Sequence, residues 1–186
     1  LDVKGSIRGE ADSDTVLLIH SDTTDGATTF VDSSPSGHAI TPTGSVHKTA
    51  NKKFGATSIE FVGDSGSDGG GATAKLDIDS VPALGTGDWT IDFWVRFKDL
   101  TGNYHGLIEN YSNGNQTTSW IASTNNDTKK LGFYGAGSGG HLAWVGGNTV
   151  MAVDTWYHVA YVHSGQNLKI YLNGVNDSAT AAGWST

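Results

Sequence analysis

The sequence predicts an all-β protein, a sandwich of two antiparallel sheets with almost no helix. The strongest observation is residues 88–97, in which apolar and polar side chains alternate. Because successive side chains of a strand point to opposite faces of its sheet, this pattern is typical of a strand with one buried face. The apolar face of this strand would carry Ile91, Phe93, Val95 and Phe97.

A second observation is a hairpin pattern towards the end of the chain. Residues 156–163 and 168–173 each alternate with period two, and the link between them is short, polar and contains Gly165. Such a link favours an antiparallel hairpin. Asn173 and Gly174 add a tight-turn signal, because both residue types tolerate a positive φ. Similar segments predict further strands at residues 15–20, 57–62, 105–111, 119–123, 131–134 and 141–145.

Composition is the third observation. The chain has 26 Gly and 3 Pro among 186 residues and no long helical period, which suits a fold with many tight turns. A β-sandwich of this size is most simply one domain. Residues 1–13 are polar and are interpreted as an N-terminal arm or linker, and residues 14–186 as the domain. No Cys is present, so no disulfide supports the fold.

Charge excludes several classes of partner. The formal net charge is −8, and the eleven basic residues are scattered along the chain. Nucleic-acid binding needs a basic patch that neutralises phosphates, so we expect no nucleic-acid partner. No apolar run is long enough to span a bilayer, so we also expect no membrane insertion.

Four segments carry a family resemblance. The hairpin reads Trp156-Tyr-His-Val-Ala-Tyr-Val162 and, after a short gap, Leu168-Lys-Ile-Tyr-Leu-Asn-Gly-Val175; residues 15–22, 53–61 and 87–97 precede it. In this order the segments resemble laminin G-like domains of the concanavalin A-like lectin/glucanase superfamily, including versions in phage and bacterial surface proteins. The resemblance runs from about residue 13 to 175 and implies a two-sheet jelly roll. It implies glycan or protein binding only as a tendency of the class.

The end of the chain departs from that family pattern. In laminin G-like domains two more strands follow the hairpin, and the last is a central strand, whose sequence pattern is missing from residues 175–186. Three interpretations stay open. The chain ends before these strands; the fold closes with fewer strands, and residues 1–10 fill the gap; or this arm completes a neighbouring subunit by strand addition, which predicts a homo-oligomer.

Aromatic residues supply the candidate binding site. Six Trp and six Tyr are many for a small sandwich. Sugar rings stack on aromatic faces because their C–H surfaces are apolar, while their hydroxyl groups need polar neighbours. The alternative is that these aromatic residues pack in the core. The residues predicted to contact carbohydrate are Asp92, Trp94, Arg96, Trp120, Tyr134 and Trp144.

Calcium is the cofactor that the sequence suggests. Calcium prefers clustered oxygen ligands from carboxylates and loop carbonyls, and Asp22, Asp25 and Asp32 lie in loops near the first predicted strands. Some laminin G-like domains bind calcium at the rim of the sandwich. Ser21 and Val62 depart from the family pattern beside these loops, and the alternative is that the three carboxylates are solvated turn residues.

Enzymatic activity is not expected. Glycoside hydrolysis needs two carboxylates across a cleft, whereas Asp92 stands alone on its strand face and Glu109 lies on another strand. The sequence therefore predicts a non-catalytic carbohydrate- or ligand-binding adhesion module of an extracellular, cell-surface or virion appendage protein. Two alternatives are a structural subunit of a filament, fibre or virion, and a polysaccharide-degrading enzyme.

Overall fold

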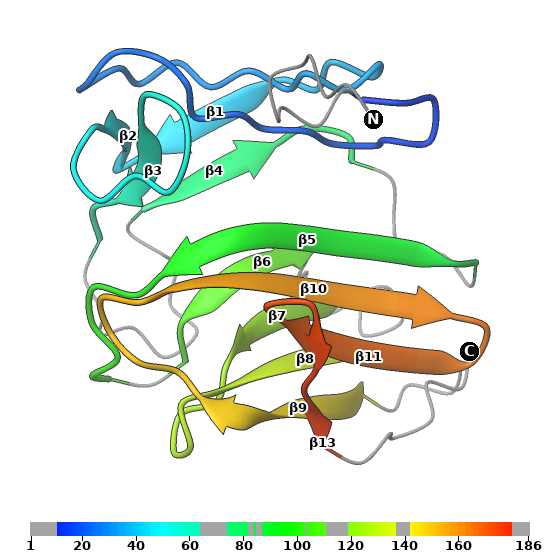
Figure 1. Cartoon of the computed structure of the whole chain (residues 1–186). Coiled ribbons are helices and arrows are strands. Elements are labelled where there is room, and N and C mark those ends of the chain that lie inside the picture. Colours follow the sequence, from blue (N-terminus) through cyan, green and yellow to red (C-terminus); the bar gives the residue numbers. More distant parts are fainter. Residues whose placement is uncertain are drawn as a thin grey trace, which may run out of the picture. The chain divides into compact units, whose positions relative to one another are not determined.

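The computed structural model confirms an all-β protein (Figure 1). It describes residues 11–63, 74–81, 84, 87–102, 104–110, 119–136 and 142–179. Within these ranges every regular element is a strand, and no helix is long and apolar enough to cross a membrane. Only residues 11–13 of the predicted N-terminal arm are described.

The chain divides into two compact units. Unit 1 consists of Leu1–Asp64 and Ala72–Pro82, and unit 2 of Ser65–Gly71 and Ala83–Thr186. The family hairpin and all six predicted carbohydrate contacts belong to unit 2. The three predicted calcium ligands belong to unit 1.

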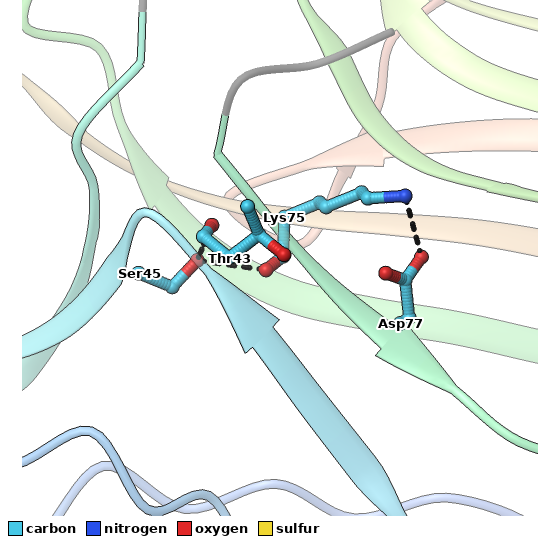
Figure 2. Close-up of polar contacts among 4 residues, drawn as sticks. All are labelled: Thr43, Ser45, Lys75 and Asp77. Carbon is cyan, nitrogen blue, oxygen red and sulfur yellow. Dashed lines mark hydrogen bonds and ion pairs between the residues drawn. The ribbon is translucent and has the colours of Figure 1, made fainter.

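Unit 1 contains two small antiparallel sheets. Strand β1 (Ile40–Thr43) pairs with β4 (Lys75–Ile78), and β2 (Ser45–Lys48) pairs with β3 (Ser58–Phe61). The Ser45 hydroxyl lies 3.2 Å from the Thr43 carbonyl oxygen and 3.0 Å from that of Lys75, so it links β2 to β1 and β4 (Figure 2). On β4, Lys75 Nζ lies 3.0 Å from Asp77 Oδ1.

The prediction of a strand at residues 15–20 is wrong. This segment forms only an isolated bridge between Ile19 and Asp32. The cause is that two side chains take the place of a neighbouring strand. The Leu18 N–H donates to Asp32 Oδ1 at 2.9 Å, and the Ser34 hydroxyl oxygen lies 3.0 Å from the Val16 carbonyl oxygen. Alternating apolar residues predict an extended backbone here, but they do not show what satisfies its hydrogen bonds.

Unit 2 is a sandwich of two antiparallel sheets. The first has the order β12-β11-β10-β5. The hairpin prediction is confirmed, because β10 and β11 pair from Val159–Leu172 to Ser164–Asn167. Its strands are β5 (Trp89–Arg96), β10 (Trp156–Ser164), β11 (Asn167–Leu172) and β12 (Val175–Asn176).

The second sheet of unit 2 has the order β13-β9-β8-β7-β6. All its pairs are antiparallel, with register shifts between β6 and β7 and between β8 and β9. Its strands are β6 (Gly106–Asn110), β7 (Trp120–Thr124), β8 (Lys130–Ala136), β9 (Leu142–Val150) and β13 (Ser178–Ala179).

The core of the sandwich centres on Phe133, which is fully buried on β8. Its ring lies 5.7 Å from that of Trp120 in its own sheet, and 5.4 and 5.5 Å from the rings of Trp89 and Tyr161 in the other sheet. Burial raises the pKa of Tyr161 far above its ordinary value. Aromatic pairs at these separations add to the hydrophobic stabilisation that burial provides.

Asp177 joins the two sheets after the hairpin, between β12 and β13. Its N–H donates to the Ile170 carbonyl of β11 at 2.8 Å, and its carboxylate accepts the Thr149 hydroxyl of β9 at 2.6 Å. The chain therefore crosses from one sheet to the other within three residues. Residues 1–10 and 180–186 lie outside the described residues, so strand completion by the N-terminal arm stays a prediction.

We expect Phe133→Ala to lower the free energy of unfolding by about 3–5 kcal/mol, because it leaves a cavity between the two sheets. Urea denaturation followed by circular dichroism measures the change. Val175→Ala is the control, since Val175 is 70% exposed and its truncation should cost within about 0.5 kcal/mol. Equal losses for the two variants would contradict the packing.

Candidate functional site

The predicted site begins on the outer face of the four-stranded sheet. Along β5, Ile91, Phe93 and Val95 pack against the core, so Asp92 and Trp94 point away from it. This alternation is confirmed, and Trp94 keeps 39% of its surface exposed.

The partner strand places further polar and aromatic groups on this face. Strands β5 and β10 are neighbours in the sheet (Figure 1). In their antiparallel register His158 of β10 lies opposite Trp94, and Trp156 lies opposite Arg96. We call Asp92, Trp94, Arg96, Trp156 and His158 the Trp94 surface.

Contacts hold the Trp94 surface in place. The rings of Trp94 and His158 lie 5.3 Å apart and are tilted by 42°. His158 Nε2 lies 3.7 Å from Asp92 Oδ2, so the imidazole stands between the indole and a carboxylate that is 62% exposed. An exposed aromatic ring thus lies beside groups that can donate and accept hydrogen bonds.

Arg96 lies at the border of this surface and already has a partner. Its Nη2 donates to Asp154 Oδ1 at 2.6 Å. Asp154 lies in the turn before β10 at φ 60°, and its N–H donates to the Phe97 carbonyl at 2.8 Å. The ion pair with Asp154 therefore holds the guanidinium at the edge of the surface.

The structure does not bring the six predicted carbohydrate contacts together. Tyr134 and Trp144 lie opposite each other on β8 and β9, on the outer face of the five-stranded sheet, with ring centres 6.5 Å apart. The two sheets pack against each other through their inner faces, so these residues and Trp94 are on opposite sides of unit 2.

Trp120 requires a correction. It is only 8% exposed, belongs to the core cluster and stacks on Phe133. It therefore exposes too little surface for a sugar ring to stack on it. Strand alternation places Trp120 on a single face, but the sequence does not tell which face of β7 is turned inward.

His158 and Trp156 belong to the Trp94 surface although the sequence does not single them out. Their signal is present in the hairpin pattern, where both occupy one face of the strand 156–163. The missing information is the register between β10 and β5, two strands that are about sixty residues apart in the chain.

The predicted calcium ligands do not form one ligand set. Asp22 Oδ1 accepts the Ala56 N–H and Asp25 Oδ1 accepts the Thr49 N–H, each at 2.8 Å. The Thr49 N–H holds the pKa of Asp25 below its ordinary value. Within the described ranges, no group of three or more His, Asp or Glu side chains could hold a metal ion.

Asp32 is a buried structural carboxylate. It accepts hydrogen bonds from the N–H groups of Leu18, Ser34 and His38 and from the Ser34 hydroxyl, at 2.7–2.9 Å. Burial by itself would raise the pKa of Asp32, but these donors outweigh it and lower the pKa to about 2. To bind the Asp32 carboxylate, calcium would have to displace these four hydrogen-bond donors.

The fold and these surfaces define a class: an antiparallel β-sandwich with aromatic and polar side chains grouped on its outer faces. The model of a laminin G-like family, described as the concanavalin A-like lectin/glucanases superfamily, matches residues 68–186, more than half of the chain. The chain belongs to this family, and the predicted resemblance to a laminin G-like domain is confirmed over these residues. The resemblance to phage and bacterial surface versions stays a prediction. Such domains commonly bind carbohydrate or mediate adhesion, and the superfamily includes glycosidases. A search of curated proteins gave no match.

Calcium binding at Asp22, Asp25 and Asp32 stays a prediction from the sequence. Thermal unfolding in calcium and in a chelator tests it, because an ion that binds only the native state raises the melting temperature. A rise that Asp25→Asn abolishes would support the site. Identical melting curves in calcium and chelator would contradict it.

We expect Asp32→Asn to lower the free energy of unfolding at neutral pH by about 2 kcal/mol, as follows from a carboxyl pKa depressed from 3.8 to about 2. In the wild type this stability is present above pH 4 and is lost as the pH falls towards 2. Urea denaturation between pH 2 and 7 should show a flatter profile for the variant. Asp14→Asn, at an exposed carboxylate, is the control; a steep profile in both variants would contradict the role of Asp32.

Proposed function

We propose that this protein is a non-catalytic carbohydrate-binding module that contacts glycan through the Trp94 surface. The observation that carries the proposal is the exposed Trp94 indole, which stands beside His158 and Asp92 on the outer face of β5 and β10. The indole offers an apolar face to the C–H side of a sugar ring, and the imidazole and carboxylate offer partners for its hydroxyl groups.

Charge points to the kind of glycan. The net charge of −8 disfavours binding of a polyanion, so we propose neutral polysaccharide as the ligand class. Such a ligand implies a location outside the cell, on a cell surface or on a virion. The module would then act in adhesion.

The arrangement of the carboxylates supports binding without hydrolysis. Asp92 lies on the four-stranded sheet and Glu109 on the five-stranded sheet, and the core separates the two sheets. A glycosidase needs two carboxyl groups on the two sides of one scissile bond, within about 5–10 Å of each other. These two residues do not make such a pair.

We expect Trp94→Ala to weaken binding of a neutral polysaccharide at least about 10-fold, because an aromatic contact at the centre of an interface typically contributes 2 kcal/mol or more. Affinity electrophoresis in gels containing β-glucan, xylan or galactomannan measures the change. Unfolding curves of the variant should match the wild type, since Trp94 lies outside the core.

Tyr104→Ala is the matched control for this experiment. Tyr104 is an exposed aromatic residue of unit 2, outside the Trp94 surface, and its truncation should leave gel mobility unchanged. Equal retardation of wild type and Trp94→Ala would contradict the proposed surface. A folded wild type that none of the glycans retards would contradict carbohydrate binding and favour a structural subunit.

A further inference from the structure

The five-stranded sheet carries a second row of side chains suited to a flat ligand. Its antiparallel register aligns Glu109 of β6, Ile121 of β7, Tyr134 of β8 and Trp144 of β9 in one line across the sheet. Phe133 and Val145, the neighbours of this line on β8 and β9, are fully buried in the core. The line therefore lies on the outer face.

Two glycines set the orientation of Trp144. Gly132 and Gly146 lie opposite each other on β8 and β9, in the row next to Tyr134 and Trp144. A Cβ atom at Gly132 would lie 2.0 Å from Cη2 and Cζ2 of Trp144, and one at Gly146 would lie 3.1 Å from its Nε1. Only glycine leaves room for the indole to lie over the backbone of these two strands.

Glycine weakens a strand interior, and in a sheet it often marks a close approach by a backbone or ligand. Here two paired glycines make room for one partly exposed indole, whose inner side is covered by the sheet. The Tyr134 ring lies beside it at 6.5 Å and a tilt of 53°. Tyr134 and Trp144 thus form an aromatic platform that rests on the outer face of the five-stranded sheet.

We infer that Tyr134 and Trp144 form a second carbohydrate contact, on the opposite side of unit 2 from the Trp94 surface, which makes the module bivalent for neutral polysaccharide. The inference rests on the proposed function. The supported indole offers its outer face for stacking on a sugar ring. Glu109 is exposed, so its carboxylate can accept hydrogen bonds from sugar hydroxyl groups. It is the one carboxylate in this line, which is fewer than an ion-binding site would need.

Bivalence has a measurable consequence that a single site lacks. A module with two sites on opposite sides can hold two polysaccharide chains and can bridge surfaces that carry them. Two linked sites also bind a polymer more tightly than either site alone, commonly by 10²–10⁴-fold. Loss of either site should therefore abolish bridging while binding at the other site persists.

The test uses polysaccharide-coated beads and gels containing the same polysaccharide, chosen as the β-glucan, xylan or galactomannan that retards the wild type most. The wild type should agglutinate the beads. Trp144→Ala should lose agglutination and still be retarded, with an apparent affinity at least about 10-fold lower. Trp94→Ala should behave in the same way, and the double variant should not be retarded. Tyr134→Ala repeats the Trp144 test without uncovering the two glycines.

Each contrary outcome has a separate meaning. Agglutination by Trp144→Ala and Tyr134→Ala at the wild-type level would overturn the second contact and leave the proposed function standing. Complete loss of retardation in Trp94→Ala alone would do the same, because one surface would then account for all binding. A wild type that none of the three polysaccharides retards would overturn the proposed function and the second contact together.

Discussion

The structure of unit 2 depends on packing between its two sheets around Phe133. The rings of Trp89 and Tyr161 approach it from one sheet and that of Trp120 from the other, while strand pairing within each sheet satisfies the backbone. In each strand that contacts Phe133, this packing decides which of the two alternating sets of side chains faces the core. The core therefore determines which side chains are left on the two outer faces.

Function, in our proposal, is a consequence of that division. Turning Phe93 and Val95 towards the core turns Asp92 and Trp94 outward, and the register with β10 adds His158 beside them. Strand alternation has the same effect in the other sheet, where the burial of Phe133 places Tyr134 on the outer face. Two aromatic surfaces on opposite sides of one sandwich thus need no cleft and no loop insertion.

Much of this fold can be predicted from the sequence, because the strands and their hairpin depend on local sequence patterns. Alternation identifies β5 and the β10–β11 hairpin, and it correctly separates the inner from the outer face of β5. The failures are non-local. The segment 15–20 is extended but is held by the Asp32 carboxylate instead of a full strand ladder.

In the candidate site, too, the sequence predicts which residues lie on strands but not which neighbouring strands surround them. Trp120 and Trp144 both lie on plausible strands, yet one stacks on Phe133 in the core and the other lies over Gly132. Their different surroundings depend on which neighbouring strands pair, and in what register. Calcium binding by the loop acids stays a prediction. In the structure Asp22 and Asp25 each accept a backbone N–H and Asp32 accepts three, and the sequence does not reveal these partners.

The central claim is that Trp94 and Trp144 contact carbohydrate, whereas the indole N–H groups of Trp89 and Trp120 are buried within the sandwich. The indole N–H resonances in ¹H–¹⁵N spectra report on these four side chains separately during titration with a neutral oligosaccharide. We expect the signals of Trp94 and Trp144 to shift in a saturable manner and those of Trp89 and Trp120 to stay in place. Saturable shifts confined to Trp89 and Trp120, or no shift at all, would contradict the claim.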